Sequence, residues 1–263
     1  MDPILHKFSG AGNVFVVLDG RGTDVSKYRN PQFISFLCME YSTDGLMILG
    51  EAPGYDFSME FYNPDGSGGM MCGNGGRCIT AFADMLGIRP SKDGSFYFLA
   101  PDGPHTAVII NHDSERDWTV RLGMKDVSES RDVLGGTFLD TGTRHFVKFV
   151  PDVEEVDVAT EGKELRWREE FAPQGTNVNF VSPAGDVLHV RTFEKGVEGE
   201  TLACGTGITA SAIAAHMKGI APSETGTDGR LTYRIRARID DLSVDFLPDH
   251  SSVFLTGPAT LLF

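Results

Sequence analysis

The chain has 263 residues, of which 41% are apolar and 23% charged, a composition typical of a globular protein with one large domain or two of ordinary size. Its formal charge of −14 argues against nucleic acid and anionic membrane surfaces as partners, because both are bound by clustered lysine and arginine. No apolar run is long enough for a transmembrane helix and the first ten residues do not resemble a signal peptide, so we expect a cytoplasmic protein.

Strand-like segments outnumber helical ones along the chain. Alternating or apolar runs predict strands at residues 13–18, 58–62 and 95–99. Residues 75–86 and 207–218 predict helices, and the glycine that follows each of them, Gly87 or Gly219, suits a left-handed C-cap. Both helices carry small and apolar residues on almost every face, which is typical of a helix enclosed by a sheet.

The four cysteines, Cys38, Cys72, Cys78 and Cys204, are too few for a disulfide framework in a chain of this size. Their spacing and that of the histidines match no zinc site, so we predict no metal. No glycine-rich fingerprint of a nucleotide-binding loop occurs, so we predict no nucleotide cofactor. Cys38 lies in an apolar segment and is expected to be a small buried core residue.

The two predicted helices begin with similar tetrapeptides, CGNG at residues 72–75 and CGTG at residues 204–207. Almost half the chain separates the two cysteines, which indicates an internal duplication. We therefore expect two similar halves, each with strands around one central helix, and a cleft between them. The polar segment 112–117 is the expected boundary.

A Cys-Gly-x-Gly helix start suits the binding of a carboxylate. Glycines let the backbone approach a ligand closely, and the N–H groups of a first helical turn favour an anion and also a thiolate. Two thiols, Cys72 and Cys204, facing one cleft would meet the needs of proton transfer at an amino-acid α-carbon. One group removes a proton from one face, and the other returns a proton to the opposite face. The N–H groups would then stabilise the carbanion in a site that excludes water.

The two active-site signatures of the diaminopimelate epimerase family resemble the segments MCGNGGRC, residues 71–78, and ETLACGTG, residues 200–207. Residues 6–13, 61–66 and 176–180 resemble further parts of the family pattern, so the resemblance covers nearly the whole chain. It implies a cofactor-free epimerase that interconverts LL- and meso-diaminopimelate in the synthesis of lysine and cell-wall precursors. It also implies a homodimer of chains with two pseudosymmetric α/β (α+β) domains, each a curled, mostly antiparallel sheet around a helix. We expect these domains at 1–115 and 116–253, with a C-terminal strand at 254–263 that returns to the first.

The resemblance also implies a role for individual residues. Cys72 and Cys204 would be the acid/base pair, and His145 and Glu194 would tune the two thiols. The implied substrate-binding residues are Asn13, Asn63, Gly73, Asn74, Thr143, Asn177, Lys195, Gly205 and Thr206. A small molecule is thus the expected partner. Purely structural roles remain open for the asparagines and for His145.

The chain departs from the family pattern where the distal, non-reacting end of the substrate is expected. Thr143 and Arg144 replace an asparagine and a proline before His145, and Lys195 replaces an arginine after Glu194. Arg144 is therefore a candidate second ligand for the distal carboxylate. Two alternatives stay open: a cofactor-free racemase of another amino acid, such as proline, hydroxyproline or histidine, and a thiol redox or binding protein whose paired cysteines form a switch.

Overall fold

A computed structural model gives the structure of the protein and describes residues 2–91 and 93–263. The chain forms two compact units: unit 1 extends to Leu122 and includes Gly257–Phe263, and unit 2 is Gly123–Thr256. The boundary expected between residues 115 and 116 falls in the turn of a hairpin inside unit 1. Within the described part of the chain, no helix has the length and apolar composition needed to cross a membrane.

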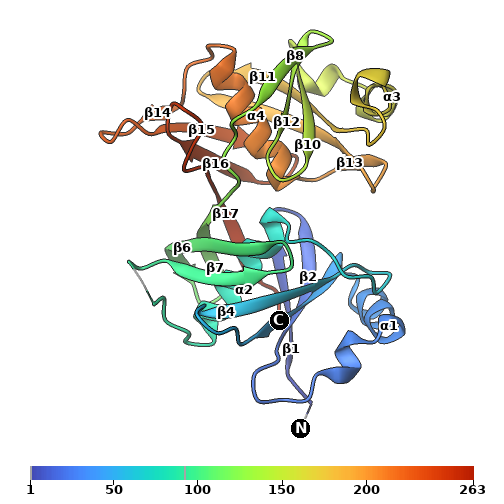
Figure 1. The fold of residues 1–263 in the computed structure, drawn as a ribbon, viewed down its shortest axis with the longest axis vertical. Coiled ribbons are helices and arrows are strands. Elements are labelled where there is room, and N and C mark those ends of the chain that lie inside the picture. Colours follow the sequence, from blue (N-terminus) through green and yellow to red (C-terminus); the bar gives the residue numbers. More distant parts are fainter. Residues whose placement is uncertain (1, 92) are drawn as a thin grey trace. The chain divides into compact units, whose positions relative to one another are not determined.

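Unit 1 is built mainly of strands (Figure 1). Its elements are β1 (Leu5–Gly10), β2 (Asn13–Asp19), η1 (Ser26–Arg29), α1 (Pro31–Tyr41), β3 (Gly45–Gly50), β4 (Phe57–Tyr62), α2 (Gly73–Met85), β5 (Phe96–Ala100), β6 (Gly103–Ser114), β7 (Asp117–Gly123) and the end of β17 (Phe254–Leu261). Strand pairing runs in chain order from β1 to β7, and β17 pairs with both β1 and β7. The sheet of unit 1 therefore closes on itself around α2.

Unit 2 has a similar composition of elements. They are β8 (Ser130–Val133), β9 (Gly136–Asp140), β10 (Arg144–Phe149), η2 (Val153–Glu155), α3 (Val158–Arg166), η3 (Glu169–Phe171), β11 (Asn177–Ala184), β12 (Val187–Glu194), β13 (Gly199–Thr201), α4 (Gly205–Met217), β14 (Glu224–Thr225), β15 (Leu231–Arg236) and β16 (Asp241–Phe246). The first residues of β17 pair with β16, so this C-terminal strand contributes to both sheets.

The two sheets have the same order of strand directions. From β1 to β6 the successive pairs are antiparallel, parallel, antiparallel, parallel and antiparallel. The series β9, β10, β11, β12, β15 and β16 repeats this order. In both units the central helix follows the fourth strand of the series, which confirms the predicted pseudosymmetric α+β fold.

Both central helices are enclosed by their sheets, as the sequence predicts. Eleven of the thirteen residues of α2 and ten of the thirteen of α4 are buried, so neither helix has a solvent face. Contacts of α2 are with β1, β2, β3 and β6, whereas α4 packs against strands from β9 to β16. Gly87 and Gly219 have φ of 74° and 78°, the left-handed conformation predicted for the residues that end these helices.

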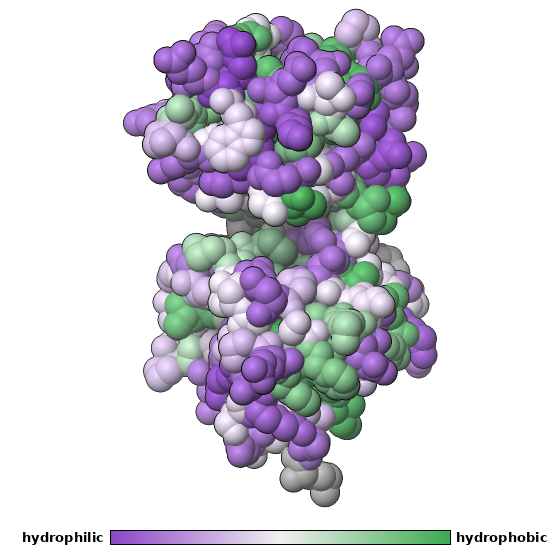
Figure 2. All heavy atoms as spheres, turned by 90° about the vertical axis from the view of Figure 1, so that its right-hand side faces the viewer, coloured by the Kyte–Doolittle hydropathy of each residue, from purple (hydrophilic) through white to green (hydrophobic). Residues whose placement is uncertain are grey.

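Two further helices, α1 and α3, were not predicted. Asn30 caps α1 by accepting hydrogen bonds from two backbone N–H groups, and Pro31 fixes the first helical φ. Cys38 lies on the inner face of α1, 3% exposed, so its predicted burial is confirmed. The outer face carries the exposed apolar side chains of Phe36 and Met39. On the face that Figure 2 shows, unit 2 is mainly hydrophilic, whereas unit 1 carries more hydrophobic groups.

Candidate active site

Cys72 is the N-cap residue of α2 and has an extended backbone. Its Sγ accepts a hydrogen bond from the N–H of Gly75 at 3.2 Å, and its side chain is only partly buried. An N–H donor and the positive end of a helix both favour negative charge on sulfur. The structure therefore gives Cys72 the setting that the sequence predicts for a thiolate, with Gly73 as the first helical residue.

Asn13 and Asn74, two predicted substrate ligands, are bonded to each other. Asn74 is buried and donates from Nδ2 to Asn13 Oδ1 at 2.7 Å. Its Oδ1 accepts from Nη2 of the fully buried Arg77 at 2.9 Å, which fixes the orientation of the amide because a guanidinium can only donate. Asn13 in turn donates to Asp44 Oδ2 at 3.3 Å. Arg77 and Asp44 were not among the predicted site residues, although they hold two of them in place.

Asn63 lies in the turn that follows β4. Its Nδ2 donates to Ser67 Oγ at 3.0 Å and its backbone N–H donates to the Ser67 carbonyl at 2.9 Å. These two hydrogen bonds stabilise the turn, which is the structural role that the sequence left open for Asn63. A ligand role for Asn63 remains a prediction.

Cys204 occupies the corresponding position in unit 2, as the N-cap of α4. Only 8% of the residue is exposed, and its Sγ lies 3.4 Å from Thr206 Oγ1. The backbone carbonyl of Thr206 accepts a hydrogen bond from Thr141 Oγ1 at 2.8 Å, so the start of α4 is tied to the loop after β9. Gly205 is the first helical residue and is buried. The two predicted thiols therefore have the same place in the two halves of the duplication.

His145 is completely buried beneath the first turn of α4. Its Nε2 lies 2.9 Å from both Thr143 Oγ1 and Thr206 Oγ1, and its Nδ1 lies 3.0 Å from Asn179 Nδ2. Burial lowers the pKa of His145 to about 3, outweighing the opposite effect of Asp140. The imidazole is therefore neutral at physiological pH, and any influence on Cys204 has to pass through hydrogen bonds rather than through a positive charge.

Three predicted residues meet at the ends of β11 and β12. Asn177 is buried, donates from Nδ2 to the Arg144 carbonyl at 3.0 Å, and accepts at Oδ1 from the backbone N–H of Lys195 at 2.7 Å. Its amide thus joins β11 to β10 and to the residue that follows β12. The side chain of Lys195 is exposed. Burial raises the pKa of the neighbouring Glu194, which favours its protonated form relative to a carboxyl group in water.

Arg144 does not share the face of His145. Because successive residues of a strand alternate, its side chain lies on the other side of β10. There its Nη1 donates to Gln174 Oε1 at 3.0 Å and to the Phe171 carbonyl at 3.3 Å, and the guanidinium lies 5.0 Å from the ring centre of Phe138. These contacts hold the guanidinium on that side of the strand, so the expectation that Arg144 reaches a substrate carboxylate is not supported.

The second glycine of each tetrapeptide makes room for the protein rather than for a ligand. A Cβ on Gly207 would overlap Asn179 Oδ1 and lie 3.3 Å from His145 Cε1. A Cβ on Gly75 would lie 3.3 Å from both Cys72 Sγ and the sulfur of Met47. Packing against these protein atoms is therefore a reason for glycine at the two positions, and the close approach of a ligand stays a prediction.

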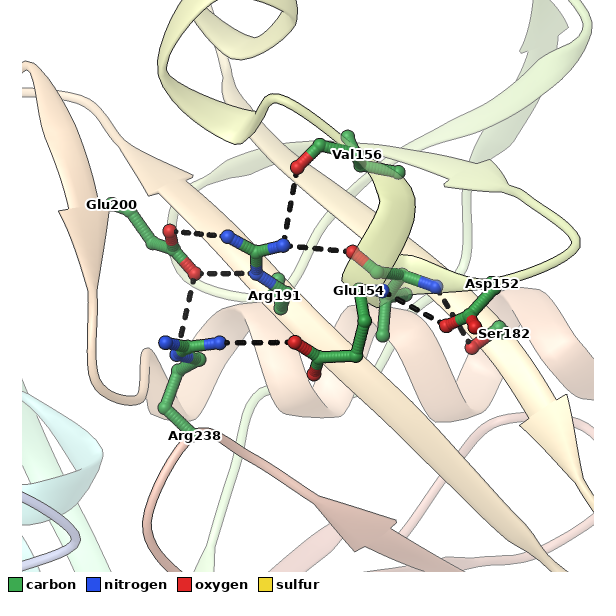
Figure 3. Close-up of polar contacts among 8 residues, drawn as sticks. Asp152, Glu154, Val156, Ser182, Arg191, Glu200 and Arg238 are labelled. Atoms are coloured by element: carbon green, nitrogen blue, oxygen red, sulfur yellow. Dashed lines mark hydrogen bonds and ion pairs between the residues drawn. The ribbon is translucent and has the colours of Figure 1, made fainter.

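An ion-pair network holds the segment that leads into Cys204 (Figure 3). Arg191 donates from Nε and Nη2 to the two carboxylate oxygens of Glu200, each at 2.7 Å, and its Nη1 donates to two backbone carbonyls at η2. Arg238 lies 3.7 Å from Glu200 and donates its backbone N–H to the Leu202 carbonyl at 3.2 Å. Two-point pairing of this kind fixes direction as well as distance. The network therefore orients the chain just before the N-cap of α4.

Solved structures of known proteins have the same fold. A phenazine biosynthesis protein of the PhzF family from Bacillus anthracis is 12% identical, with a TM-score of 0.73 over 100% of this chain and 98% of that chain. A hydroxyproline epimerase from Agrobacterium vitis is 16% identical, with a TM-score of 0.62 over 98% of this chain and 88% of that chain. The protein therefore has the fold that these proteins share.

Sequence relatives identify the family. The diaminopimelate epimerase from Flavobacterium psychrophilum is 38% identical over 98% of both chains, and that from Aquifex aeolicus is 38% identical over 98% of this chain and 95% of its own. The family model described as diaminopimelate epimerase matches residues 137–262. The chain belongs to the diaminopimelate epimerase family, which confirms the resemblance drawn from the two cysteine segments.

Proposed function

We propose that the protein interconverts LL- and meso-diaminopimelate without a cofactor. Membership of the diaminopimelate epimerase family over nearly the full chain is the observation that carries this proposal. The repeated N-cap cysteine supports it, because epimerisation at an α-carbon needs two proton carriers and the duplication supplies two equivalent thiols. By the same resemblance, we include in the proposal a homodimer that acts in the cytoplasm.

In the proposed mechanism, Cys72 and Cys204 serve as the two carriers. One starts as a thiolate and removes the α-proton, and the other starts as a thiol and returns a proton to the opposite face. One proton leaves the α-carbon and one is returned to it, so no net proton is gained or lost, and the reverse reaction exchanges the roles of the two thiols. The first turns of α2 and α4, which begin at Gly73 and Gly205, would bind the reacting carboxylate through backbone N–H groups. Asn74 and Thr206 would complete this part of the site.

The proposed reaction can be tested directly in deuterated water. Purified protein is incubated with LL-diaminopimelate, without added pyridoxal phosphate and with a chelator, and the isomers are separated by chiral chromatography and mass spectrometry. We expect the meso isomer, with deuterium at the inverted α-carbon, because the returned proton comes from a thiol that exchanges with solvent. Absence of both meso product and deuterium would contradict the proposed function.

A racemase of proline or hydroxyproline is the second candidate, favoured by the shared fold with a hydroxyproline epimerase. The same deuterium assay with L-proline and trans-4-hydroxy-L-proline separates the two candidates. Turnover of either compound in place of diaminopimelate would replace the first proposal by the second.

Lys195 and Arg144 provide a matched pair for the distal carboxylate. Each substitution by alanine removes one positive charge. The guanidinium of Arg144 is hydrogen-bonded within unit 2, whereas Lys195 is exposed. We expect Lys195→Ala to raise KM about ten- to a hundredfold with a smaller change in kcat, the effect of losing one charge-assisted hydrogen bond. Arg144→Ala should leave KM within about twofold. Steady-state kinetics check both values, and an unchanged KM for Lys195→Ala would remove Lys195 from the proposed site.

A further inference from the structure

A layer of buried polar side chains lies between α4 and the sheet of unit 2, and the proposed mechanism leaves part of it without a role. The layer consists of His145 on β10, Asn179 on β11 and Thr192 on β12, all of them at most 3% exposed. The glycine at position 207 allows the first turn of α4 to pack directly against Asn179. Buried polar groups of this kind are costly unless every hydrogen bond is made, so the direction of each bond can be worked out.

The amide of Asn179 can have only one orientation. Its Nδ2 lies 3.3 Å from the carbonyl oxygen of Phe146, which can only accept, so this atom has to be the donor. The same Nδ2 lies 3.0 Å from His145 Nδ1, and Asn179 Oδ1 accepts from Thr192 Oγ1 at 2.9 Å. A reversed amide would place two carbonyl oxygens against each other. Therefore His145 Nδ1 is an acceptor and carries no proton.

A neutral imidazole with an unprotonated Nδ1 carries its proton on Nε2. His145 is neutral because burial lowers its pKa to about 3. Its Nε2–H therefore donates to the hydroxyl groups 2.9 Å away, one of which is Thr206 Oγ1. Thr206 Oγ1 also lies 3.1 Å from Thr143 Oγ1. Thr143 Oγ1 accepts from Asn177 Nδ2 and from His145 Nε2–H, so its own hydrogen is directed at Thr206.

Thr206 then has one direction left for its own hydrogen. A hydroxyl accepts two hydrogen bonds and donates one. With His145 and Thr143 as donors to Thr206 Oγ1, the remaining neighbour is Cys204 Sγ, at 3.4 Å. A hydroxyl hydrogen directed at sulfur stabilises the thiolate more than the thiol.

We propose that Asn179 is a positioning residue for Cys204: it fixes the tautomer of His145, and His145 in turn makes Thr206 a donor to the Cys204 sulfur. This inference rests on the proposed function only in taking Cys204 as a proton carrier. Asp140 on β9 acts electrostatically on His145, and Glu194 lies on β12 two residues after Thr192; neither carboxyl group is changed in the variants below.

The tautomer is measured first, in the unmodified protein. Long-range proton–nitrogen spectra of histidine labelled with nitrogen-15 distinguish a protonated from an unprotonated ring nitrogen. We expect His145 to be protonated at Nε2 and unprotonated at Nδ1 from pH 6 to pH 8. Protonation at Nδ1 would overturn the proposal without any variant, and the measurement needs no substrate.

The effect on sulfur is measured next, through the pH dependence of alkylation by iodoacetamide at Cys204, with Cys72 as an internal control in the same sample. Asn179→Leu and Thr206→Val should each slow alkylation of Cys204 at neutral pH about tenfold and shift its midpoint to higher pH, the expected loss of one hydrogen bond to a charged group. The double variant should show no larger shift than either single one, because both break the same path. Cys72 should be unaffected.

Thr209→Val is the matched control, since it removes another buried hydroxyl of α4, one that donates to the Gly205 carbonyl. It should leave the Cys204 midpoint in place. If circular dichroism shows that Asn179→Leu does not fold, alkylation of Thr206→Val and the proton–nitrogen spectra of the unmodified protein still test the proposal. An unchanged Cys204 midpoint in folded Thr206→Val would refute the proposal while leaving the epimerase assay free to succeed or fail.

Discussion

Replacement of either Cys72 or Cys204 by alanine is expected to lower kcat/KM for epimerisation by about 10²- to 10⁴-fold or more, the usual contribution of a positioned acid or base. In the proposed mechanism each face of the α-carbon needs its own proton carrier, so one remaining thiol should not complete the inversion. The fold should persist in both variants, because the helices they cap are held by enclosure in the sheets rather than by the cap alone. Chiral product analysis in both reaction directions, together with thermal melting, checks the two parts of this expectation.

Cys38→Ala is the matched control for the loss of a thiol. Cys38 lies on the buried face of α1 in the cluster of Val16, Leu37 and their neighbours, so this change should lower stability without affecting either proton carrier. A Cys72→Ala protein that still epimerises in both directions at a substantial rate would show that the reaction does not need two thiols.

The enclosed helices were predictable because their signals are local. The paired tetrapeptides at Cys72 and Cys204 mark where the helices begin, and Gly87 and Gly219 mark where they end. Helix α1 also has a local signal, since Asn30 and Pro31 form a capped start. It was missed because its apolar residues do not follow a clear helical period, and tertiary packing against β2 and β3 decides its conformation instead.

The parallel strand pairs could not be predicted from local patterns. Strand β12 pairs with β15 through Leu188 and Ile235, which are joined only by a long crossover that contains α4. These long-range pairs recur in both halves of the duplication, whose traces in the sequence, the paired tetrapeptides and the glycines that end the two helices, say nothing about which strands pair.

The site was only partly predictable for a similar reason. The thiols and the helix starts follow from the tetrapeptides, but the residues that orient them come from other strands. Asn179 had a usable signal: alternation along a strand places it on the same face as Asn177, two residues earlier. The contact of Asp44 with Asn13 had no local signal, because only the parallel pairing of β2 and β3 brings the two residues together.

Substitution of Gly207 by alanine is expected to destabilise the protein even though alanine is the better helix former. The gain in helix propensity is at most about 1 kcal/mol. Against it stands the overlap of the new Cβ with Asn179 Oδ1, in a layer where that oxygen also accepts from Thr192. Overpacking of a buried site costs about 1–3 kcal/mol, so the net effect should be a loss of stability.

The same substitution should also lower activity, because either way of relieving the overlap disturbs the proposed site. If Asn179 moves, His145 loses the donor to its Nδ1, and if α4 moves, Cys204 and the first-turn N–H groups move with it. We expect kcat/KM to fall at least about tenfold, since small displacements of catalytic groups are costly. Gly199→Ala is the control: a Cβ there would meet nothing within 4 Å, so both melting temperature and kcat/KM should stay near those of the unmodified protein. Equal stability and activity of the two variants would show that the first turn of α4 tolerates a side chain at position 207, and that its close contact with Asn179 is not required.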